Sequence, residues 1–320
     1  MNTALMIHRF LVALRGSVGN RERRHSIVVL PLLPQRVTNQ MRHRQWYSLL
    51  ALAGAACSSV AAPIDPAYKL FAHRGGVVEE KFPDNSAAAV QAAIQRGYWG
   101  LEVDIRETKD GVLVMRHDAD LKLYYNDPRQ LADLTWEQIA ALPSTVPGHA
   151  TSRFEDVVKA AREAGLWLML DSKDPHSSEF CAKIEAVLTK HDMLNRSLII
   201  GTRDALDYFL GKAPVGLKYR PLRARLEADP RAKDRYFLFD HGSLTVEMVR
   251  WAQEQGVRVV PSINVYHYYD SSTMAGKSRD ELAPIILAAA QRDVEKLKAL
   301  GVTDFQIDSE FDRWFEAAKR

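Results

Sequence analysis

Two histidines, an arginine and two carboxylates are concentrated between His73 and Asp118, at the ends of short apolar runs typical of strands. The stretch reads HRGG, then PDNS, then GLEVDIRETKDGVLVMRHD. It lacks the periodic helix face that would explain these residues as solvated surface charge. This set of residue types predicts a metal-assisted site for phosphoryl chemistry.

Three carboxylates are the candidate metal ligands: Glu102, Asp104 and Asp171. Glu102 and Asp104 are two residues apart on an extended run, so they point to the same side of their strand. Converging carboxylates repel one another unless they are protonated or neutralised, and a divalent cation with oxygen ligands, Mg²⁺ or Ca²⁺, would neutralise them. Zinc is disfavoured because the sequence has neither a cysteine cluster nor a histidine-rich ligand spacing.

His73 and His117 flank these carboxylates, and an unperturbed imidazole pKa of about 6.5 suits a general acid and base. Arg74 is predicted to hold a phosphate oxygen, and Lys173 to supply positive charge for the developing oxyanion. Taken singly, each residue has a structural interpretation: a strand-end histidine is usually a hydrogen-bonding residue, and Glu-x-Asp is often a solvated face or a salt bridge. Their joint position at one end of a predicted barrel favours a functional site.

The elements that position these residues follow from an alternation of short apolar runs with amphipathic segments, which is the pattern of repeated βα units. Eight units predict a closed (β/α)8 TIM barrel, in which chemistry lies at the carboxyl ends of the strands. An open doubly wound sheet is the alternative, but no glycine-rich dinucleotide fingerprint follows the first strand. The predicted strands are 69–72, 100–105, 167–171, 197–201, 215–219, 236–240, 257–263 and 304–308, and the predicted helices are 86–96, 153–164, 177–191, 203–211, 222–232, 245–255, 279–300 and 310–319.

One apolar run, 112–115, follows the second strand too closely for a crossover helix, so we expect a β-hairpin extension there. Asp110-Gly111 is a strong signal for a two-residue turn. In that register His117 lies opposite Asp104, at the same end of the barrel. Further polar residues at predicted strand ends are Lys218, Arg220, Asp240, His241, Asn264 and Asp308.

The first 61 residues differ from the rest of the chain. They carry eight arginines and one acidic residue, which leaves 35 basic and 39 acidic residues in the remainder, so the net charge of +3 gives no support for a nucleic-acid partner. Residues 41–61 have a basic start, an apolar run and small residues before a cleavage site after Ala61, as in a signal peptide. We therefore expect a periplasmic or secreted protein with a single domain over 62–320.

Residues 1–40 are expected to be a mis-assigned or disordered extension, with Met41 as the true start. The apolar run of the leader is too short for a comfortable membrane span. A lipoprotein signal at Cys57 is disfavoured because Gly54 stands where a leucine is usual. Cys181 is the only cysteine after the leader, so we expect a buried, inert thiol and no intrachain disulfide.

These residues are also where the chain resembles the glycerophosphodiester phosphodiesterase family. That family shows His-Arg-Gly after its first strand, Pro-Glu-Asn-Thr/Ser entering its first helix, Glu-x-Asp on its second strand, Thr-x-Asp-Gly before a His-Asp pair, and Glu-x-Lys on a later strand. The matching segments here are His73-Arg74-Gly75, Pro83-Asp84-Asn85-Ser86, Glu102-Val103-Asp104, Thr108-Lys109-Asp110-Gly111, His117-Asp118 and Asp171-Ser172-Lys173. The likeness spans roughly residues 69–312.

The resemblance implies metal-dependent hydrolysis of a glycerophosphodiester to glycerol 3-phosphate and an alcohol, through a cyclic phosphate or by direct attack of water. It implies His73 and His117 as the acid–base pair and Glu102, Asp104 and Asp171 as metal ligands. Arg74, Asn85, Lys173 and Asn264 are expected to bind the substrate, a small phosphodiester or lysolipid. The sequence decides neither the head group, nor the metal, nor the oligomeric state.

Departures from the family pattern leave alternatives open. Asp171 replaces a glutamate, as in the related sphingomyelinase D type of lipid phosphodiesterase, which is the second hypothesis. A non-catalytic barrel that binds phosphodiesters is the third, although pure binding needs no pair of histidines beside a metal. The aromatic run of Tyr266, Tyr268 and Tyr269 with His267 would suit a choline-like head group through cation–π contact, or else simply packs the loop.

Overall fold

The computed structural model describes residues 63–76, 83–174, 177–241, 244–268 and 279–317. The predicted extension 1–40, the predicted signal peptide 41–61 and its cleavage site after Ala61 lie outside these residues. Tyr269 does so as well. No helix in the described part of the chain is long and apolar enough to cross a membrane.

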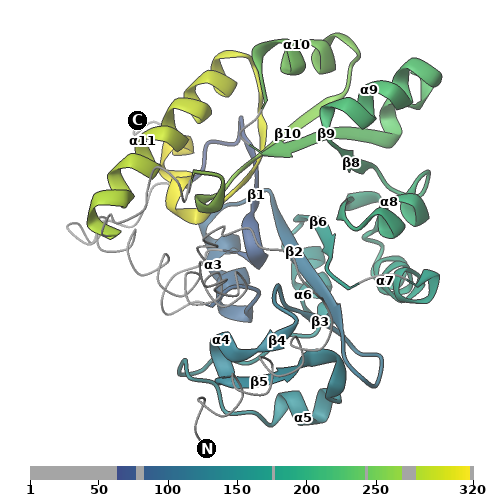
Figure 1. Cartoon of the computed structure of the whole chain (residues 1–320), viewed down its shortest axis with the longest axis vertical. Helices are drawn as coiled ribbons and strands as arrows, with labels where there is room; N and C mark the ends of the chain where they lie inside the picture. Colours follow the sequence, from purple (N-terminus) through teal and green to yellow (C-terminus); the bar gives the residue numbers. More distant parts are fainter. Residues whose placement is uncertain (1–62, 77–82, 175–176, 242–243, 269–278, 318–320) are drawn as a thin grey trace, which may run out of the picture. The chain divides into compact units, whose positions relative to one another are not determined.

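Eight parallel strands form a closed barrel, because β1 pairs with β2 on one side and with β11 on the other. This closure confirms the (β/α)8 fold and excludes the open sheet. All eight strands occupy the predicted places, and Figure 1 shows them with the helices outside. They are β1 (Lys69–Ala72), β2 (Gly100–Glu107), β6 (Trp167–Ser172), β7 (Ser197–Gly201), β8 (Val215–Leu217), β9 (Tyr236–His241), β10 (Arg258–Ile263) and β11 (Asp304–Ile307).

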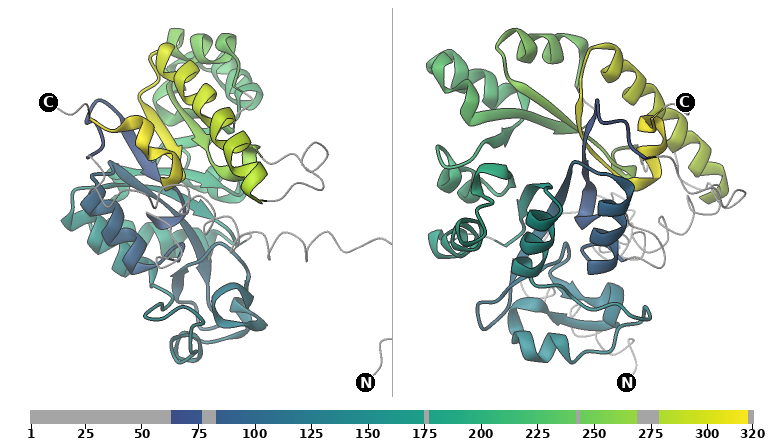
Figure 2. Two further views of the ribbon diagram at one scale, coloured as in Figure 1. Left: turned by 90° about the vertical axis from the view of Figure 1, so that its left-hand side faces the viewer. Right: turned by 180° about the vertical axis from the view of Figure 1, so that it is seen from behind.

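The helices that alternate with these strands begin at serine or threonine caps in four cases. The side chains of Ser86, Ser177, Thr202 and Thr245 each accept a hydrogen bond from a backbone amide of the first helical turn. Figure 2 shows the helices from two further sides. They are α3 (Ala87–Arg96), α6 (Phe154–Glu163), α7 (Ser178–Lys190), α8 (Arg203–Phe209), α9 (Tyr219–Ala228), α10 (Val246–Glu254) and α11 (Arg279–Ala299).

Two predicted helices differ from the structure. Helix α9 ends at Ala228 and a separate 3-10 segment, η4 (Pro230–Arg235), follows it, because a proline disfavours helical backbone at the residue before it, here Asp229. The last predicted helix, 310–319, is a 3-10 segment in its described part, η6 (Ser309–Phe315). Neither difference moves a candidate site residue.

The predicted hairpin is present, but its register was wrong by one residue. Strand β3 (Leu113–Met115) runs antiparallel to β2 with Met115 opposite Ile105. The loop has three residues, because the amide of Gly111 donates to the carbonyl of Thr108 at 2.9 Å and Gly111 adopts a φ of 83°. The carbonyl of Asp104 therefore accepts from the amide of Arg116, at 2.9 Å, and His117 lies one residue beyond the predicted partner.

An insertion for which the sequence predicted no element separates β3 from α6. It contains β4 (Asp120–Leu121), α4 (Lys122–Tyr125), β5 (Asp127–Gln130), η2 (Leu131–Asp133) and α5 (Trp136–Ala140). Its side chains form a small apolar cluster of their own around Leu121, Leu131 and Ile139. The insertion reaches the barrel mouth through Tyr124, whose hydroxyl accepts a hydrogen bond from the amide of Asp84 at 3.2 Å.

Candidate functional site

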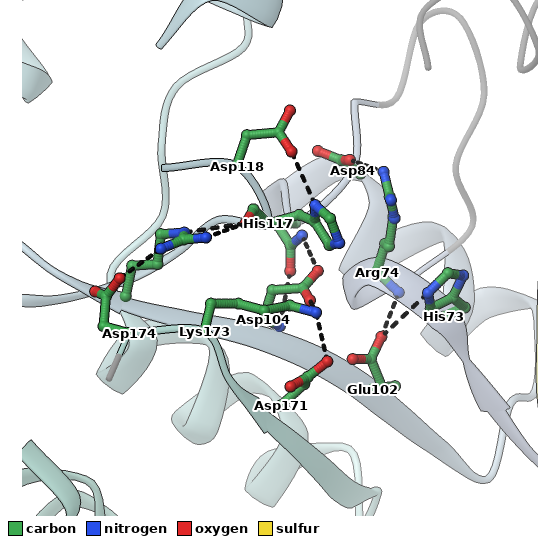
Figure 3. A network of polar contacts seen from close by, with 12 residues as sticks. His73, Arg74, Asp84, Glu102, Asp104, His117, Asp118, Asp171, Lys173 and Asp174 are labelled. Atoms are coloured by element: carbon green, nitrogen blue, oxygen red, sulfur yellow. Dashed lines mark hydrogen bonds and ion pairs between the residues drawn. The ribbon is translucent and has the colours of Figure 1, made fainter. Parts of the chain in front are cut away.

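The three predicted metal ligands converge at the carboxyl ends of two neighbouring strands. Asp104 on β2 is the register partner of Asp171 on β6, and Glu102 lies one turn of the pleat before Asp104 on the same side. One carboxylate oxygen from each of the three residues lies within 4.8 Å of the other two. Glu102 and Asp104 are buried. Figure 3 shows the side chains of all three residues close together.

The crowding of these carboxylates shifts their pKa values. Burial, together with the charge of Asp104, raises the pKa of Glu102 to about 8. Burial also raises the pKa of Asp171. For Asp104 the charges of Lys173, His117 and Arg74 outweigh burial and hold its pKa well below the usual range. Three convergent carboxylates with only oxygen donors fit a hard divalent cation such as Mg²⁺ or Ca²⁺.

A glycine on the next strand keeps Asp171 in place. Gly201 ends β7 with a φ of 104°, and a Cβ atom there would lie 2.5 Å from Oδ1 of Asp171. Any larger residue would therefore push this carboxylate away from the other two.

Lys173 lies between two of the carboxylates. Its Nζ is 3.0 Å from Oδ1 of Asp104 and forms an ion pair with Asp171. Against burial, the two carboxylates raise the pKa of Lys173, so it stays charged. The predicted phosphate-binding lysine is thus held at the metal cluster.

His73 follows β1 directly, in the 3-10 turn η1 (His73–Gly75). Its Nδ1 lies 2.6 Å from Oδ1 of Asp308, and its Nε2 lies 3.9 Å from Oε2 of Glu102. Burial alone would lower the pKa of His73, but Asp308 and Glu102 outweigh burial and raise it. A proton on Nδ1 donates to Asp308, which leaves Nε2 directed toward the carboxylate cluster.

Asp308 is the functional residue to which sequence reasoning gave no role. It follows β11, the last strand, and its second oxygen accepts a hydrogen bond from the amide of Val265 at 2.7 Å. The available signal was an acidic residue at a strand end of the predicted barrel. Nothing in the sequence indicated that this residue contacts His73, which lies 235 positions away.

Arg74 is held on three sides. Its amide donates to Oε2 of Glu102 at 2.8 Å, its Nη1 donates to Oδ2 of Asp84 at 3.0 Å, and its guanidinium lies 5.2 Å from the ring centre of Tyr266. The backbone of Arg74 has a φ of 55°, which turns the chain sharply at the end of β1. Tyr266 therefore packs against an arginine of the protein itself, and Tyr268 packs edge-on against Phe311.

The two predicted substrate-binding asparagines are placed differently. Asn85 donates from Nδ2 to Oδ2 of Asp104 at 2.8 Å and accepts at Oδ1 from the amide of Asp104 at 3.2 Å, so both ends of its side chain support a metal ligand. Asn264 follows β10 at the barrel mouth and donates weakly to Ser262 at 3.3 Å. Its buried Oδ1 has no hydrogen-bond partner among the described residues, which leaves an acceptor for a substrate hydroxyl.

His117 lies at the same end of the barrel as predicted, despite the altered register. Its Nδ1 lies 2.9 Å from Oδ1 of Asp118, and 30% of its side chain is exposed. Burial and the charge of Arg74 lower the pKa of His117. Both histidines thus meet a carboxylate through Nδ1, and each can present Nε2 to a bound substrate.

The other side of the mouth carries the remaining strand-end residues. His241, at the end of β9, stacks on His267 with ring centres 4.1 Å apart. The amide of His241 donates to Asp240 at 2.9 Å. Lys218 stands at the residue before α9. Burial and then the charge of Lys218 lower the pKa of His241.

Comparison with known proteins agrees with this arrangement. Residues 73–215 match the Glycerophosphoryl diester phosphodiesterase family. Glycerophosphodiester phosphodiesterase 1 of Mus musculus is 29% identical over 181 residues, covering 52% of this chain and 53% of that protein. A glycerophosphodiester phosphodiesterase of Bacillus altitudinis is 37% identical over 71 residues, covering 22% of this chain and 28% of the relative. This chain spans about half the length of the mammalian relatives with the longest alignments.

Solved structures share the fold. A glycerophosphoryl diester phosphodiesterase from Parabacteroides distasonis superposes with a TM-score of 0.58 at 18% identity, covering 81% of this chain and 95% of that one. An Oleispira antarctica phosphodiesterase in complex with the product sn-glycerol-3-phosphate has a TM-score of 0.59 at 19% identity, covering 77% and 94%. Residues 73–215 thus match the glycerophosphoryl diester phosphodiesterase family that the motifs resemble, and the barrel agrees with the fold of the solved members.

Proposed function

We propose that the protein is a phosphodiesterase that hydrolyses glycerophosphodiesters to glycerol 3-phosphate and an alcohol, with a divalent cation and a histidine acid–base pair. The observation that carries the proposal is the convergence of Glu102, Asp104 and Asp171 within 4.8 Å. His73 lies 3.9 Å from Glu102, and His117 lies at the same end of the barrel (Figure 3). Two imidazoles beside such a cluster supply what hydrolysis needs and binding alone does not.

The residues divide the chemistry between them. A bound cation would be held by Glu102, Asp104 and Asp171 and would offset charge on the phosphate oxygens. Arg74 and Lys173 add positive charge for the same oxygens. One histidine removes the proton of the attacking hydroxyl or water, and the other gives a proton to the departing alcohol oxygen, so the proton count balances.

The decisive experiment is an assay of phosphodiester head groups with Mg²⁺, with Ca²⁺ and with a chelator. We expect release of glycerol 3-phosphate that EDTA abolishes and that His73→Ala and His117→Ala each eliminate. Full activity in chelator-treated protein would refute the metal requirement. A suitable control is His191→Ala, because His191 pairs with Glu155 on the outside of the barrel.

The aspartate at position 171 favours a second candidate, a sphingomyelinase D-like lipid phosphodiesterase. The same assay separates the two. Release of choline from sphingomyelin or lysophosphatidylcholine, without release of glycerol 3-phosphate from glycerophosphocholine, would support the second candidate. Tight binding of a phosphodiester without any product, measured by calorimetry, would support a non-catalytic barrel instead.

We also propose that the protein is exported, on the strength of the basic, apolar and small-residue regions within 41–61. The partner expected from the site is a small-molecule phosphodiester. Amino-terminal sequencing of the protein from a periplasmic or secreted fraction should give Ala62 as the first residue. A mature protein that retains residues 41–61 would contradict the proposal.

A further inference from the structure

An arginine beside the candidate site grips the backbone of His117. Arg106 donates from Nε to the carbonyl oxygen of His117 at 3.0 Å and from Nη2 to the same oxygen at 2.7 Å. Arg106 has the same side-chain direction on β2 as Glu102 and Asp104, since the three are spaced two apart. One face of β2 therefore carries two predicted metal ligands, Glu102 and Asp104, followed by Arg106.

Arg106 is itself fixed by a carboxylate from the neighbouring strand end. Its Nη1 forms an ion pair with Oδ1 of Asp174, three residues after Asp171. The other oxygen of Asp174 accepts a hydrogen bond from the amide of Glu107 at 2.7 Å. Figure 3 shows, as dashed lines, the contacts that Asp174 and the main chain of His117 make. The side chains of Arg106 and Asp174 are only 13% and 23% exposed, so solvent competes little for either group.

This arrangement fixes two points of residue 117. The planar guanidinium holds the carbonyl from two nitrogens, which sets the direction of the peptide after His117. Asp118 holds Nδ1 of the ring at 2.9 Å. With the main chain and one ring nitrogen both held, the direction of Nε2 is fixed as well. Loss of such alignment is costly, because a displacement of about 1 Å can slow a reaction by about 10²-fold.

We propose that Arg106, anchored by Asp174, is a positioning residue for His117 and thereby a determinant of turnover. The inference rests on the proposed role of His117 as a catalytic acid or base. The chain order supports it, because Asp174 belongs to the same strand end that supplies Asp171 and Lys173. One segment therefore arranges both the metal cluster and the histidine across from it.

The test compares Arg106→Gln, Arg106→Lys and Asp174→Asn in the full chain, assayed with the substrate that the wild type turns over. We expect Arg106→Gln to lower kcat by roughly 30- to 100-fold while KM and metal affinity change by less than about threefold. Arg106→Lys should recover part of the loss, since an ammonium can donate to the carbonyl but cannot hold Asp174 in the same plane. Asp174→Asn should cause a smaller fall in kcat.

A matched control is Arg129→Gln. Arg129 pairs with Asp127 on the insertion, and half of its side chain is exposed. We expect this variant to keep the kcat of the wild type. A kcat for Arg106→Gln within twofold of the wild type would overturn the inference, provided that a cooperative thermal unfolding transition shows the variant to be folded. So would an equal loss in the Arg129 control.

A second measurement separates this inference from the proposed function. Nitrogen-15 NMR of the His117 ring, assigned by its loss in His117→Gln, reports the tautomer and the mobility of the imidazole without any substrate. We expect a single Nδ1-protonated form in the wild type and a mixture or broadening in Arg106→Gln. Unchanged signals would refute the positioning role even if the wild type hydrolyses no phosphodiester in the panel. Changed signals with an inactive wild type would refute the proposed function alone.

Discussion

Replacement of Asp308 by asparagine should remove most turnover, because it inverts the hydrogen bonding of His73. Asp308 accepts from Nδ1 of His73 at 2.6 Å with one oxygen and from the amide of Val265 at 2.7 Å with the other. An asparagine keeps only one acceptor, and the Val265 amide can only donate. The amide oxygen therefore turns to Val265, and the NH₂ group faces Nδ1. The proton of His73 then moves to Nε2, the nitrogen nearest Glu102.

The size of this effect follows from the tautomer. In a Ser–His–Asp triad the corresponding change lowers kcat by about 10⁴-fold. The barrel mouth here is partly open to solvent, so we expect kcat to fall by roughly 10²- to 10⁴-fold. The assay is release of glycerol 3-phosphate at saturating metal, with kcat and KM determined separately. The loss should appear in kcat.

The control for this variant lies on the same strand. Asp304 begins β11 at the opposite end of the barrel, where it pairs with Arg258, so Asp304→Asn should lower stability and leave kcat per folded molecule unchanged. Asp308→Asn with kcat within threefold of the wild type would refute the assignment of Nε2 as the reacting nitrogen.

Further outcomes are expected from the same geometry. Gly201→Ala should weaken metal binding at least tenfold in calorimetry, since its Cβ would lie 2.5 Å from Asp171, and should cost about 1–3 kcal/mol of stability at a φ of 104°. Glu102→Gln should lower metal affinity by a similar factor, whereas Glu107→Gln, on the same strand but paired with Lys183, should not. Burial lowers the pKa of His149 to about 4, so the unfolded chain binds a proton below about pH 6.5 that the folded protein excludes. The free energy of unfolding should therefore fall as the pH is lowered from 6.5 to 4, by about 1 kcal/mol at pH 5 after allowance for solvent screening. The difference in Tm between pH 7 and pH 5 should be smaller in His149→Phe than in the wild type.

The barrel was predictable from sequence because each of its parts carries a local signal. A parallel strand buried on both faces is a short apolar run, and a covering helix shows a period of 3.6 residues. Glycines end several of the helices, as at Gly97, which has a φ of 83°. These signals are independent of what the element packs against, so all eight strands could be placed without coordinates.

The hairpin register could not be predicted by the same means. Asp110-Gly111 suits a two-residue turn and also the last two positions of a three-residue loop, and the choice between them shifts the pairing of the two strands by one residue. The side chain of Asp110 accepts from the hydroxyl of Thr108 at 2.6 Å, which favours the longer loop. Such a contact depends on geometry that residue types alone do not specify. The insertion was missed for a related reason: its helices and strands have two to five residues, too few for a period to be recognised.

Within the candidate site, sequence could single out the proposed reacting groups but not the residues that hold them. Histidines, arginine and carboxylates at strand ends stand out by type, whereas Arg106 and Asp308 are ordinary charged residues whose importance depends on what they touch. Asn85 shows the same limit. Its motif position marked it as a site residue, but only the structure shows that Asp104 takes up both ends of its amide.

The residues of the candidate site come from both halves of the chain. The family match covers residues 73–215, which include the metal cluster and both histidines. Asp308, which contacts His73, lies beyond the match, and so does the stacked pair of His241 and His267. The first half of the barrel therefore supplies the candidate metal ligands and both histidines, but it does not suffice for the proposed chemistry, because Asp308 holds His73 from the last strand. The strand ends of β8 and β9 and the turn after β10 add a lysine and a histidine pair to the same mouth.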